Sequence, residues 1–127
     1  ECYHLGSLHA GLLAIDGKLV KGVEMKAAEK AVQEEIGKLC RAEVGEKELD
    51  KVKNRVESMI AFEDISLLSR CNSLAFYELL GDAGMMNHEM SRYQAVTASQ
   101  IQKAAGDIFR EDNCSTLYYY ANGAAAL

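Results

Sequence analysis

EKELDKVKNRVESMIAFE (46–63) opens a stretch that runs on to STLYYY (115–120), and this stretch decides the fold. Apolar residues recur at helical spacing through three or four segments of it, and the closing segment alternates side chains as a β-strand does. Helices with one apolar face need a surface to cover. Only one other convincing strand is expected, within residues 5–19. The helices therefore have too little sheet beneath them, and we expect the chain to be part of a larger domain.

Most helix boundaries follow from apolar spacing combined with end signals. We expect one helix over residues 24–41, a second that begins after Gly45, and a third that starts beyond the polar break at 63–66. Gly81 is expected to end the third helix, because glycine adopts the left-handed conformation that many helix C-termini require.

A short helix is expected at about residues 85–93, and the last one begins after Thr97. Thr97 and Gln100 form a capping box, in which each side chain bonds the backbone amide of the other residue. Val96 and Ile101 add the matching hydrophobic staple. The apolar face of this helix is expected to be buried through Ile101, Ala104, Ala105, Ile108 and Phe109.

Composition places the chain among soluble globular proteins of one domain, because its 127 residues are 49% hydrophobic and 26% charged. The net charge is -5, with acidic and basic residues interspersed, so no nucleic-acid partner is expected. No apolar run is long enough for a membrane span. Residues 123–127, GAAAL, are interpreted as a vector-derived tail, which leaves 1–122 as the domain. The compartment stays open between cytoplasm and periplasm.

The four cysteines never occur in a paired C-x-x-C spacing. Free cysteine is among the most frequently buried residue types, so they are interpreted as small buried thiols. A disulfide framework is not expected at this density. The four are Cys2, Cys40, Cys71 and Cys114.

Four blocks of the chain, in order, resemble the end of a pitrilysin/insulinase-type zinc peptidase, in particular a bacterial one. The blocks are ELDKVKNRVES (48–58), LAFYELLGD (74–82), RYQAVTASQI (92–101) and FREDNCSTLYY (109–119). Residues 11–19 fit the strand that precedes the first helix of that family. The resemblance covers nearly the whole chain.

This resemblance implies an α+β half-domain with four or five helices packed on one face of a partial β-sheet. It would come from the non-catalytic C-terminal part of the peptidase, which repeats the catalytic fold and closes over it to form a substrate chamber. The implied partners are the catalytic domain of the same parent chain and an extended peptide substrate, held as an added strand. The catalytic zinc would belong to that other domain. The parent's proteolytic activity, rather than any activity of this chain, is what the resemblance implies.

Two other functions remain open. A stand-alone helical interaction module would explain the amphipathic helices without any missing strands. A scaffold subunit of a processing-peptidase-like assembly would share the family fold without proteolysis.

Zinc chemistry of the inverted zincin type needs His-x-x-Glu-His on one helix, so that two imidazoles face one metal. None of the three histidines begins such a motif. His88 and Glu89 are interpreted as solvated surface residues of a short polar helix. Cys2 and His4 offer two possible ligands, too few for a metal site. No metal-binding or cofactor-binding residue is therefore predicted.

No catalytic residue is predicted either. Cys71 has no flanking glycine-rich turn to expose it, and three serines have no histidine or acidic partner at a suitable spacing. Arg92 and Tyr93 invite comparison with an Arg and a Tyr that grip substrate in the family, but that pair lies further apart and further upstream. We interpret Arg92 and Tyr93 as packing residues. The serines are Ser66, Ser69 and Ser73.

Unpaired strands predict self-association. If residues 5–19 and 115–120 belong to a larger sheet, their backbone donors and acceptors lack partners in the isolated chain. We expect self-association through these strands, or a domain-swapped dimer, with the tyrosines at 118–120 in or near the contact.

Overall fold

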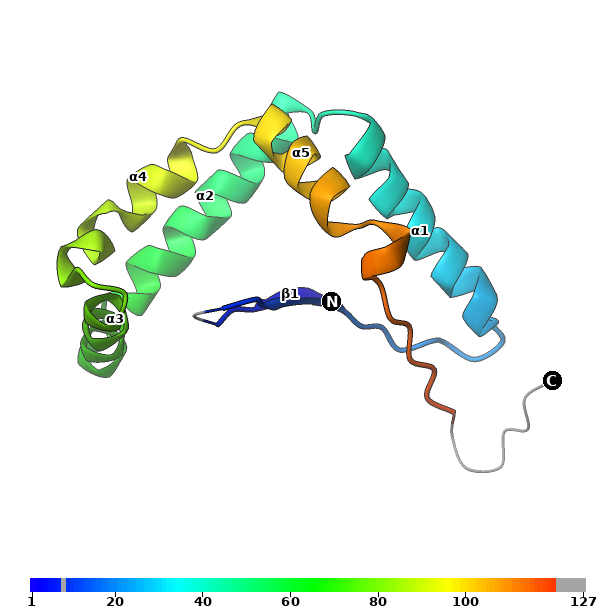
Figure 1. Cartoon of the computed structure of the whole chain (residues 1–127), viewed down its shortest axis with the longest axis horizontal. Helices are drawn as coiled ribbons and strands as arrows, with labels where there is room; N and C mark the ends of the chain where they lie inside the picture. The colour runs from blue at the N-terminus through cyan, green and yellow to red at the C-terminus, as the bar shows by residue number, and fades with distance from the viewer. Residues whose placement is uncertain (8, 121–127) are drawn as a thin grey trace.

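The computed structural model of the protein describes residues 1–7 and 9–120. This part of the chain has an α+β fold, with five α-helices and one two-stranded antiparallel sheet (Figure 1). The predicted α+β class is confirmed. The expected tail at 123–127 lies outside the described residues.

The sheet is a local hairpin at the start of the chain. Strand β1 (Cys2–Leu5) pairs antiparallel with β2 (Leu12–Ile15), and Leu5 stands opposite Leu12. The strand predicted within residues 5–19 is present as β2, whereas β1, which begins at Cys2 and pairs with it, was not predicted.

Gly11 lets the start of β2 pass close to the end of β1. A Cβ atom at this position would lie 2.9 Å from the Leu5 carbonyl oxygen, so only glycine allows the two strands to approach this closely. The backbone of Asp16 then donates to the Glu1 carbonyl across 3.0 Å, which extends the pairing beyond β2. The short connection makes the pairing antiparallel.

Residues 115–120 are not a strand, which corrects a prediction. The backbone is extended at Cys114, but this segment pairs with no strand among the described residues. Alternation in sequence favours an extended backbone, whereas a strand also needs a hydrogen-bonding neighbour. The segment instead returns beside the start of the first helix, where Tyr118 bonds Glu29.

Two helix pairs form the frame of the molecule. In the first, α1 (Met25–Arg41) packs against α5 (Ala98–Ile108), and the Gln102 side chain donates to the Cys40 carbonyl across 3.4 Å. Ala105 of α5 is only 5% exposed. The helix predicted over 24–41 is confirmed, since Glu24 is its N-cap.

In the second pair, α2 (Glu46–Glu63) packs against α4 (Glu89–Gln94). Lys53 donates to the Gln94 carbonyl across 2.8 Å, and the Gln94 side chain donates to Glu57 across 3.3 Å. Helix α2 begins directly after Gly45, as predicted. These bonds join segments that are far apart in sequence, so they hold the pair together.

Helix α3 (Leu67–Leu79) follows the predicted break and ends as expected at Gly81. Gly81 has a φ of 108°, and its amide donates to the Glu78 carbonyl across 2.9 Å. The Asp82 amide reaches back to the Tyr77 carbonyl across 3.1 Å. This is the Schellman pattern, in which a left-handed residue lets the last carbonyls of a helix be satisfied.

The helix predicted at about 85–93 consists of two elements. A 3-10 segment, η1 (Ala83–His88), is capped by the Asp82 carboxylate, which accepts from the Gly84 amide across 2.8 Å. It runs directly into α4. A second short 3-10 segment, η2 (Glu111–Asn113), follows α5.

The capping box that starts α5 is present. The Thr97 hydroxyl accepts from the Gln100 amide across 3.2 Å, and the Gln100 side chain accepts from the Thr97 amide across 2.9 Å. The buried face predicted for this helix is only partly correct. Ala105 is buried, but Ala104 and Ile108 are exposed, because α1 covers too narrow a strip of α5.

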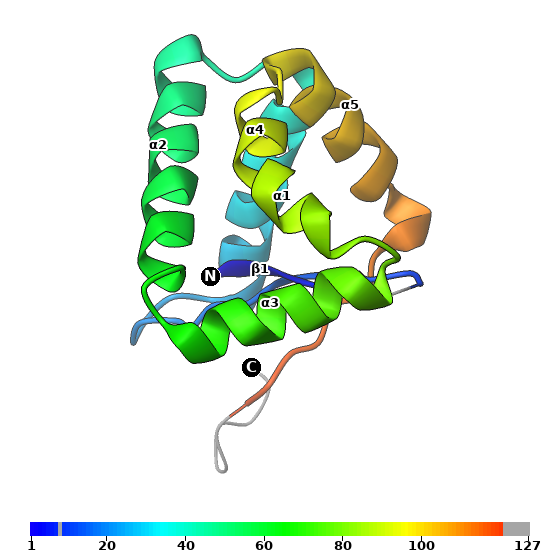
Figure 2. The same cartoon turned by 90° about the vertical axis from the view of Figure 1, so that its left-hand side faces the viewer.

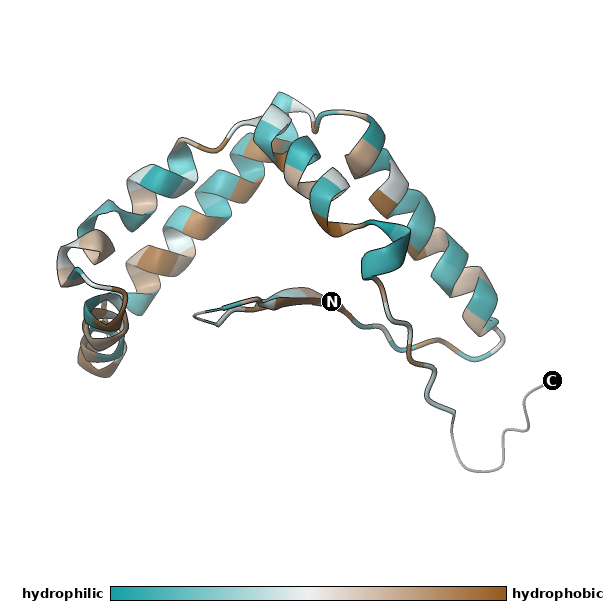
Figure 3. Cartoon of the chain, viewed as in Figure 1, coloured by the Kyte–Doolittle hydropathy of each residue, from teal (hydrophilic) through white to brown (hydrophobic). Residues whose placement is uncertain are grey.

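The helices pack on one another rather than on the sheet. Helices α1, α2, α4 and α5 form an arch to one side of the hairpin (Figure 1), and α3 runs across the end of the α2–α4 pair (Figure 2). All of β1 is exposed, and Leu5 and Leu12 keep 54% and 60% of their surface in solvent. The helices were predicted to pack on one face of the sheet, but in this structure they do not. The hairpin and α3 are the most hydrophobic ribbons (Figure 3).

Candidate functional site

An open groove lies beside α4 and has a volume of about 340 Å³. Its side chains combine two phenols, one carboxylate, one guanidinium and one aliphatic group. They are Tyr77, Glu89, Arg92, Tyr93 and Val96.

The end of α3 creates this groove. The Schellman turn at Gly81 stops α3, and η1 then reverses the chain so that α4 returns past Tyr77. Glu89 and Arg92 lie three positions apart on α4, so they lie on one side of that helix. Local turn chemistry thus brings together residues from two helices.

The charges in the groove affect Tyr77. Partial burial, and then the neighbouring Glu89 carboxylate, raise the pKa of Tyr77 above its usual 10.0, while Arg92 opposes this shift. A phenol is protonated at neutral pH even without this shift, so Tyr77 is a hydrogen-bond donor there. With Arg92 as a second donor and Glu89 as an acceptor, the groove is equipped to bind a polar ligand. Tyr93 is 45% exposed, so water reaches the groove freely.

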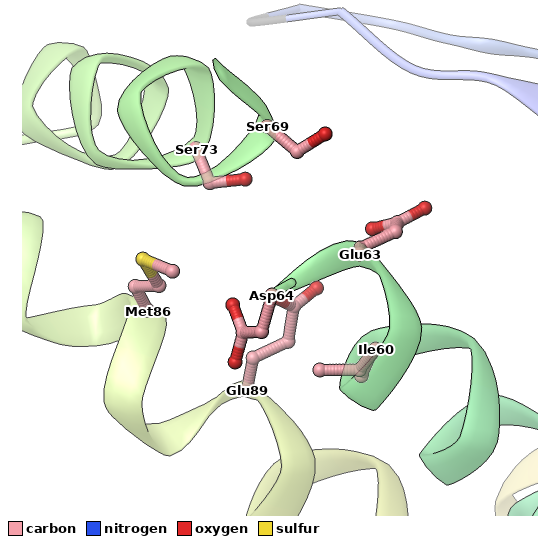
Figure 4. A pocket seen from close by; sticks show the side chains of 7 residues that line it. All are labelled: Ile60, Glu63, Asp64, Ser69, Ser73, Met86 and Glu89. Atoms are coloured by element: carbon pink, nitrogen blue, oxygen red, sulfur yellow. The ribbon is translucent and has the colours of Figure 1, made fainter. Parts of the chain in front are cut away.

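A smaller hollow of about 30 Å³ lies between α2, α3 and η1 (Figure 4). Asp64 and Glu89 lie side by side in it, with Glu63, Ser69 and Ser73 around them (Figure 4). This volume holds little more than one or two water molecules. Its lining residues are Ile60, Glu63, Asp64, Ser69, Ser73, Met86 and Glu89.

Several residues weighed in the sequence analysis take ordinary structural positions. Ser66 is the N-cap of α3 and accepts from the Ser69 amide across 3.3 Å. His88 ends η1, and its carbonyl accepts from the Ser91 hydroxyl across 2.8 Å. Cys2 and His4 lie on the exposed strand β1, with Tyr3 between them.

The cysteines are not the buried thiols that were predicted. Cys2, Cys71 and Cys114 are exposed, and Cys40 is partly covered. All four are free thiols. Across the described ranges, no group of three or more His, Cys, Asp or Glu side chains converges in a way that could hold a metal ion.

Tyr77 was not singled out from the sequence, although Arg92 and Tyr93 were considered. It lies twelve positions before Glu89, a distance that no helical or strand periodicity connects. The available signal was Gly81, since a helix that ends there makes the following segment turn back toward α3. Asp64 was missed for a similar reason, because its relation to Glu89 depends on the packing of α2 against α4.

Comparison with known family models, curated proteins and solved structures finds no match to this chain. In the part of the chain that the structure describes, no helix is both long and apolar enough to cross a membrane.

Proposed function

We propose that this chain is part of the non-catalytic C-terminal domain of a pitrilysin/insulinase-like zinc peptidase, where it helps to form the substrate chamber. The proposal starts from the four sequence blocks, which fall on α2, on α3, on the α4–α5 region and on the segment after α5. The role is structural: the chain supplies a wall, and the catalytic zinc is bound elsewhere in the parent protein.

One observation about surface area supports a role inside a larger assembly. The chain has an accessible surface of 10958 Å². A compact folded monomer of 13.9 kDa is expected to expose about 6,700 Å². The eight residues outside the described ranges, 8 and 121–127, account for about 1,000 Å² at most, even at the value for an unfolded chain. An uncovered surface of this size is typical of a part that packs against other protein.

The hairpin indicates where that protein would pack. A two-stranded sheet alone is marginally stable in water and becomes stable when more strands or a helix cover it. Leu5 and Leu12 form a cross-strand apolar pair that stays exposed, and within the described residues neither outer strand edge pairs with a third strand. Additional strands from the parent, or an extended peptide, would complete this sheet.

The residues of this chain do not fit a zinc site. His4, His9 and His88 do not occur within one helical turn of one another, and the described acidic and sulfur side chains form no cluster around them. We therefore assign no step of peptide hydrolysis to this chain. The groove around Tyr77 and Arg92 is better suited to binding than to bond cleavage, because no serine, cysteine or histidine lines it.

The first test is the sequence of the gene around this segment. A His-x-x-Glu-His motif several hundred residues upstream in the same reading frame would support the proposal. A start codon close to Glu1, with no such motif, would overturn it in favour of an interaction module.

A second test uses binding. If the motif is found, the upstream segment should co-purify with this chain when the two are expressed together. Leu12→Glu should abolish the association, because it places a charge on the exposed apolar face of the hairpin. Ala31→Glu on the exposed side of α1 adds the same charge and should leave the association intact. Equal binding of both variants would argue against the hairpin as the contact.

A further inference from the structure

We propose that the outer face of α3 is a self-association surface, on which a second copy of this chain packs antiparallel about Leu74. This inference goes beyond the proposed function and does not depend on it. It begins with the composition of α3, whose 13 residues include only two charged side chains, Arg70 and Glu78. Four of the 13 residues are leucine and one is phenylalanine, and such large apolar side chains are normally buried.

In the single chain, α3 is not buried. Its inner side contacts η1, where Ser69, Ser73 and Tyr77 are partly covered. The large apolar residues around the rest of the helix stay open to solvent. These are Leu67 at 78% exposure, Leu68 at 70%, Leu74 at 45%, Phe76 at 51% and Leu79 at 76%. Of these, Leu67 and Leu74 lie on the side of the helix that also carries Arg70 and Glu78, whereas the other three lie on other sides of it.

The amount of uncovered surface is compatible with a dimer. The excess over a compact monomer is at least about 3,000 Å² per chain, after the residues outside the described ranges are allowed for. Obligate homodimer interfaces bury about 2,000 to 5,000 Å² over both partners. This excess is spread over the whole chain, and a contact on α3 would cover only part of it.

The two charges select the orientation of the second copy. Arg70 and Glu78 lie at equal distances on either side of Leu74, and all three share one side of the helix because they are four positions apart. In an antiparallel pair centred on Leu74, Arg70 faces Glu78 of the second copy, and symmetry repeats the contact. A parallel pair would place like charges opposite each other. No ion pair within the described part of the chain involves Arg70 or Glu78.

Charge exchange tests this arrangement on the full chain. The wild-type chain should sediment as a dimer at micromolar concentration. R70E and E78R should each weaken the dimer by about tenfold or more, because each change creates two like-charge contacts by symmetry. An equimolar mixture of R70E and E78R should recover dimerisation. In the mixed dimer, one copy carries negative charge at both positions and the other carries positive charge at both, so each contact again joins opposite charges. Recovery also shows that both variants are folded.

Cysteine crosslinking tests the register. In a background in which all four native cysteines are serine, L74C should form a disulfide-linked dimer on mild oxidation, because the two Cα atoms meet at the symmetry axis. A chain with Cys71 alone is the matched control. In the proposed dimer, the Cys71 residues of the two copies would lie about 9 Å apart along the helix axis, beyond the reach of a disulfide.

A monomeric wild type, absence of recovery on mixing, or faster crosslinking through Cys71 than through L74C would each overturn the inference. These outcomes are separate from the gene context and co-purification tests of the proposed function. A dimer that is insensitive to both charge changes but lost on deleting 118–120 would also overturn it, and would place self-association at the tyrosines instead, as the sequence suggested.

Discussion

The Tyr118 hydroxyl donates a hydrogen bond to the Glu29 carboxylate across 2.5 Å, joining two residues that are 89 positions apart. This contact ties the extended segment after η2 to the first turns of α1. Hydrogen bonding to Glu29, followed by desolvation, raises the pKa of Tyr118 above its usual 10.0. The contact therefore has a measurable signature.

Replacing Glu29 by Gln should lower the pKa of Tyr118 toward 10.0, because the substitution removes the negative charge that favours the protonated phenol. Ultraviolet absorbance during an alkaline titration measures this change. Tyr118→Phe removes the absorbance change that comes from this residue and so shows which part of the titration curve belongs to Tyr118. An unchanged titration midpoint in the Gln variant would mean that the contact does not persist in solution.

Alkaline pH should release the segment around Tyr118. The folded-state pKa is raised, so the stabilising contact is fully present below the unfolded value of 10.0 and is lost as pH rises through the raised value. We expect protease sensitivity at 115–120 to increase over this pH range in the wild type. Tyr118→Phe should be sensitive already at neutral pH, and a wild type without any pH dependence would contradict the prediction.

Thr97→Ala should lower the free energy of unfolding by about 0.5–2 kcal/mol, the usual effect of losing an N-cap acceptor. The hydroxyl of Thr97 accepts from the Gln100 amide, and alanine leaves that amide without its partner. Chemical denaturation measures the difference. Thr97→Ser keeps the hydroxyl and should stay close to wild type. If Thr97→Ala and Thr97→Ser are equally stable, the N-cap hydrogen bond does not contribute to the free energy of unfolding.

The same substitution at two glycines should have opposite effects. Gly81 has a φ of 108° and ends α3, so Gly81→Ala should destabilise the chain by about 1 kcal/mol. Gly106 lies inside α5, where alanine should stabilise by about 0.5–1 kcal/mol. Neither new Cβ atom meets another atom within 4 Å, so the difference in stability between the two variants reflects backbone conformation and not packing. Thermal unfolding of both variants gives the result.

The isolated chain should bind no stoichiometric zinc and cleave no peptide, because its histidines do not form a ligand set. Metal analysis of dialysed protein and an assay with unstructured peptides measure these properties. One tightly held zinc per chain that is lost in His4→Ala or His88→Ala would contradict the prediction.

Helix ends were the part of the fold most accessible from sequence, since their signals are local. The capping box at Thr97 involves two residues within one helical turn, and Gly81 acts through its own backbone conformation. Such features depend little on the rest of the molecule. The same reasoning correctly located the break between α2 and α3.

The groove could not be predicted in the same way. Tyr77 and Glu89 meet because α3 ends, η1 turns and α4 packs on α2, and each of these steps adds to the next. Sequence contained the residue types and the position of the turn. The direction in which α4 returns is decided by packing, which no short stretch of sequence specifies.

The sequence by itself determined which segments are helical and where they stop, because hydrogen bonds within one helical turn and the apolar period act over a few residues. Only the tertiary structure decided which extended segments become strands. Residues 12–15 found a partner across a short glycine-containing turn, whereas 115–120 have a better strand pattern and no neighbouring edge among the described residues. A strand is defined by its pairing, and pairing depends on which other segment comes close enough to form the ladder.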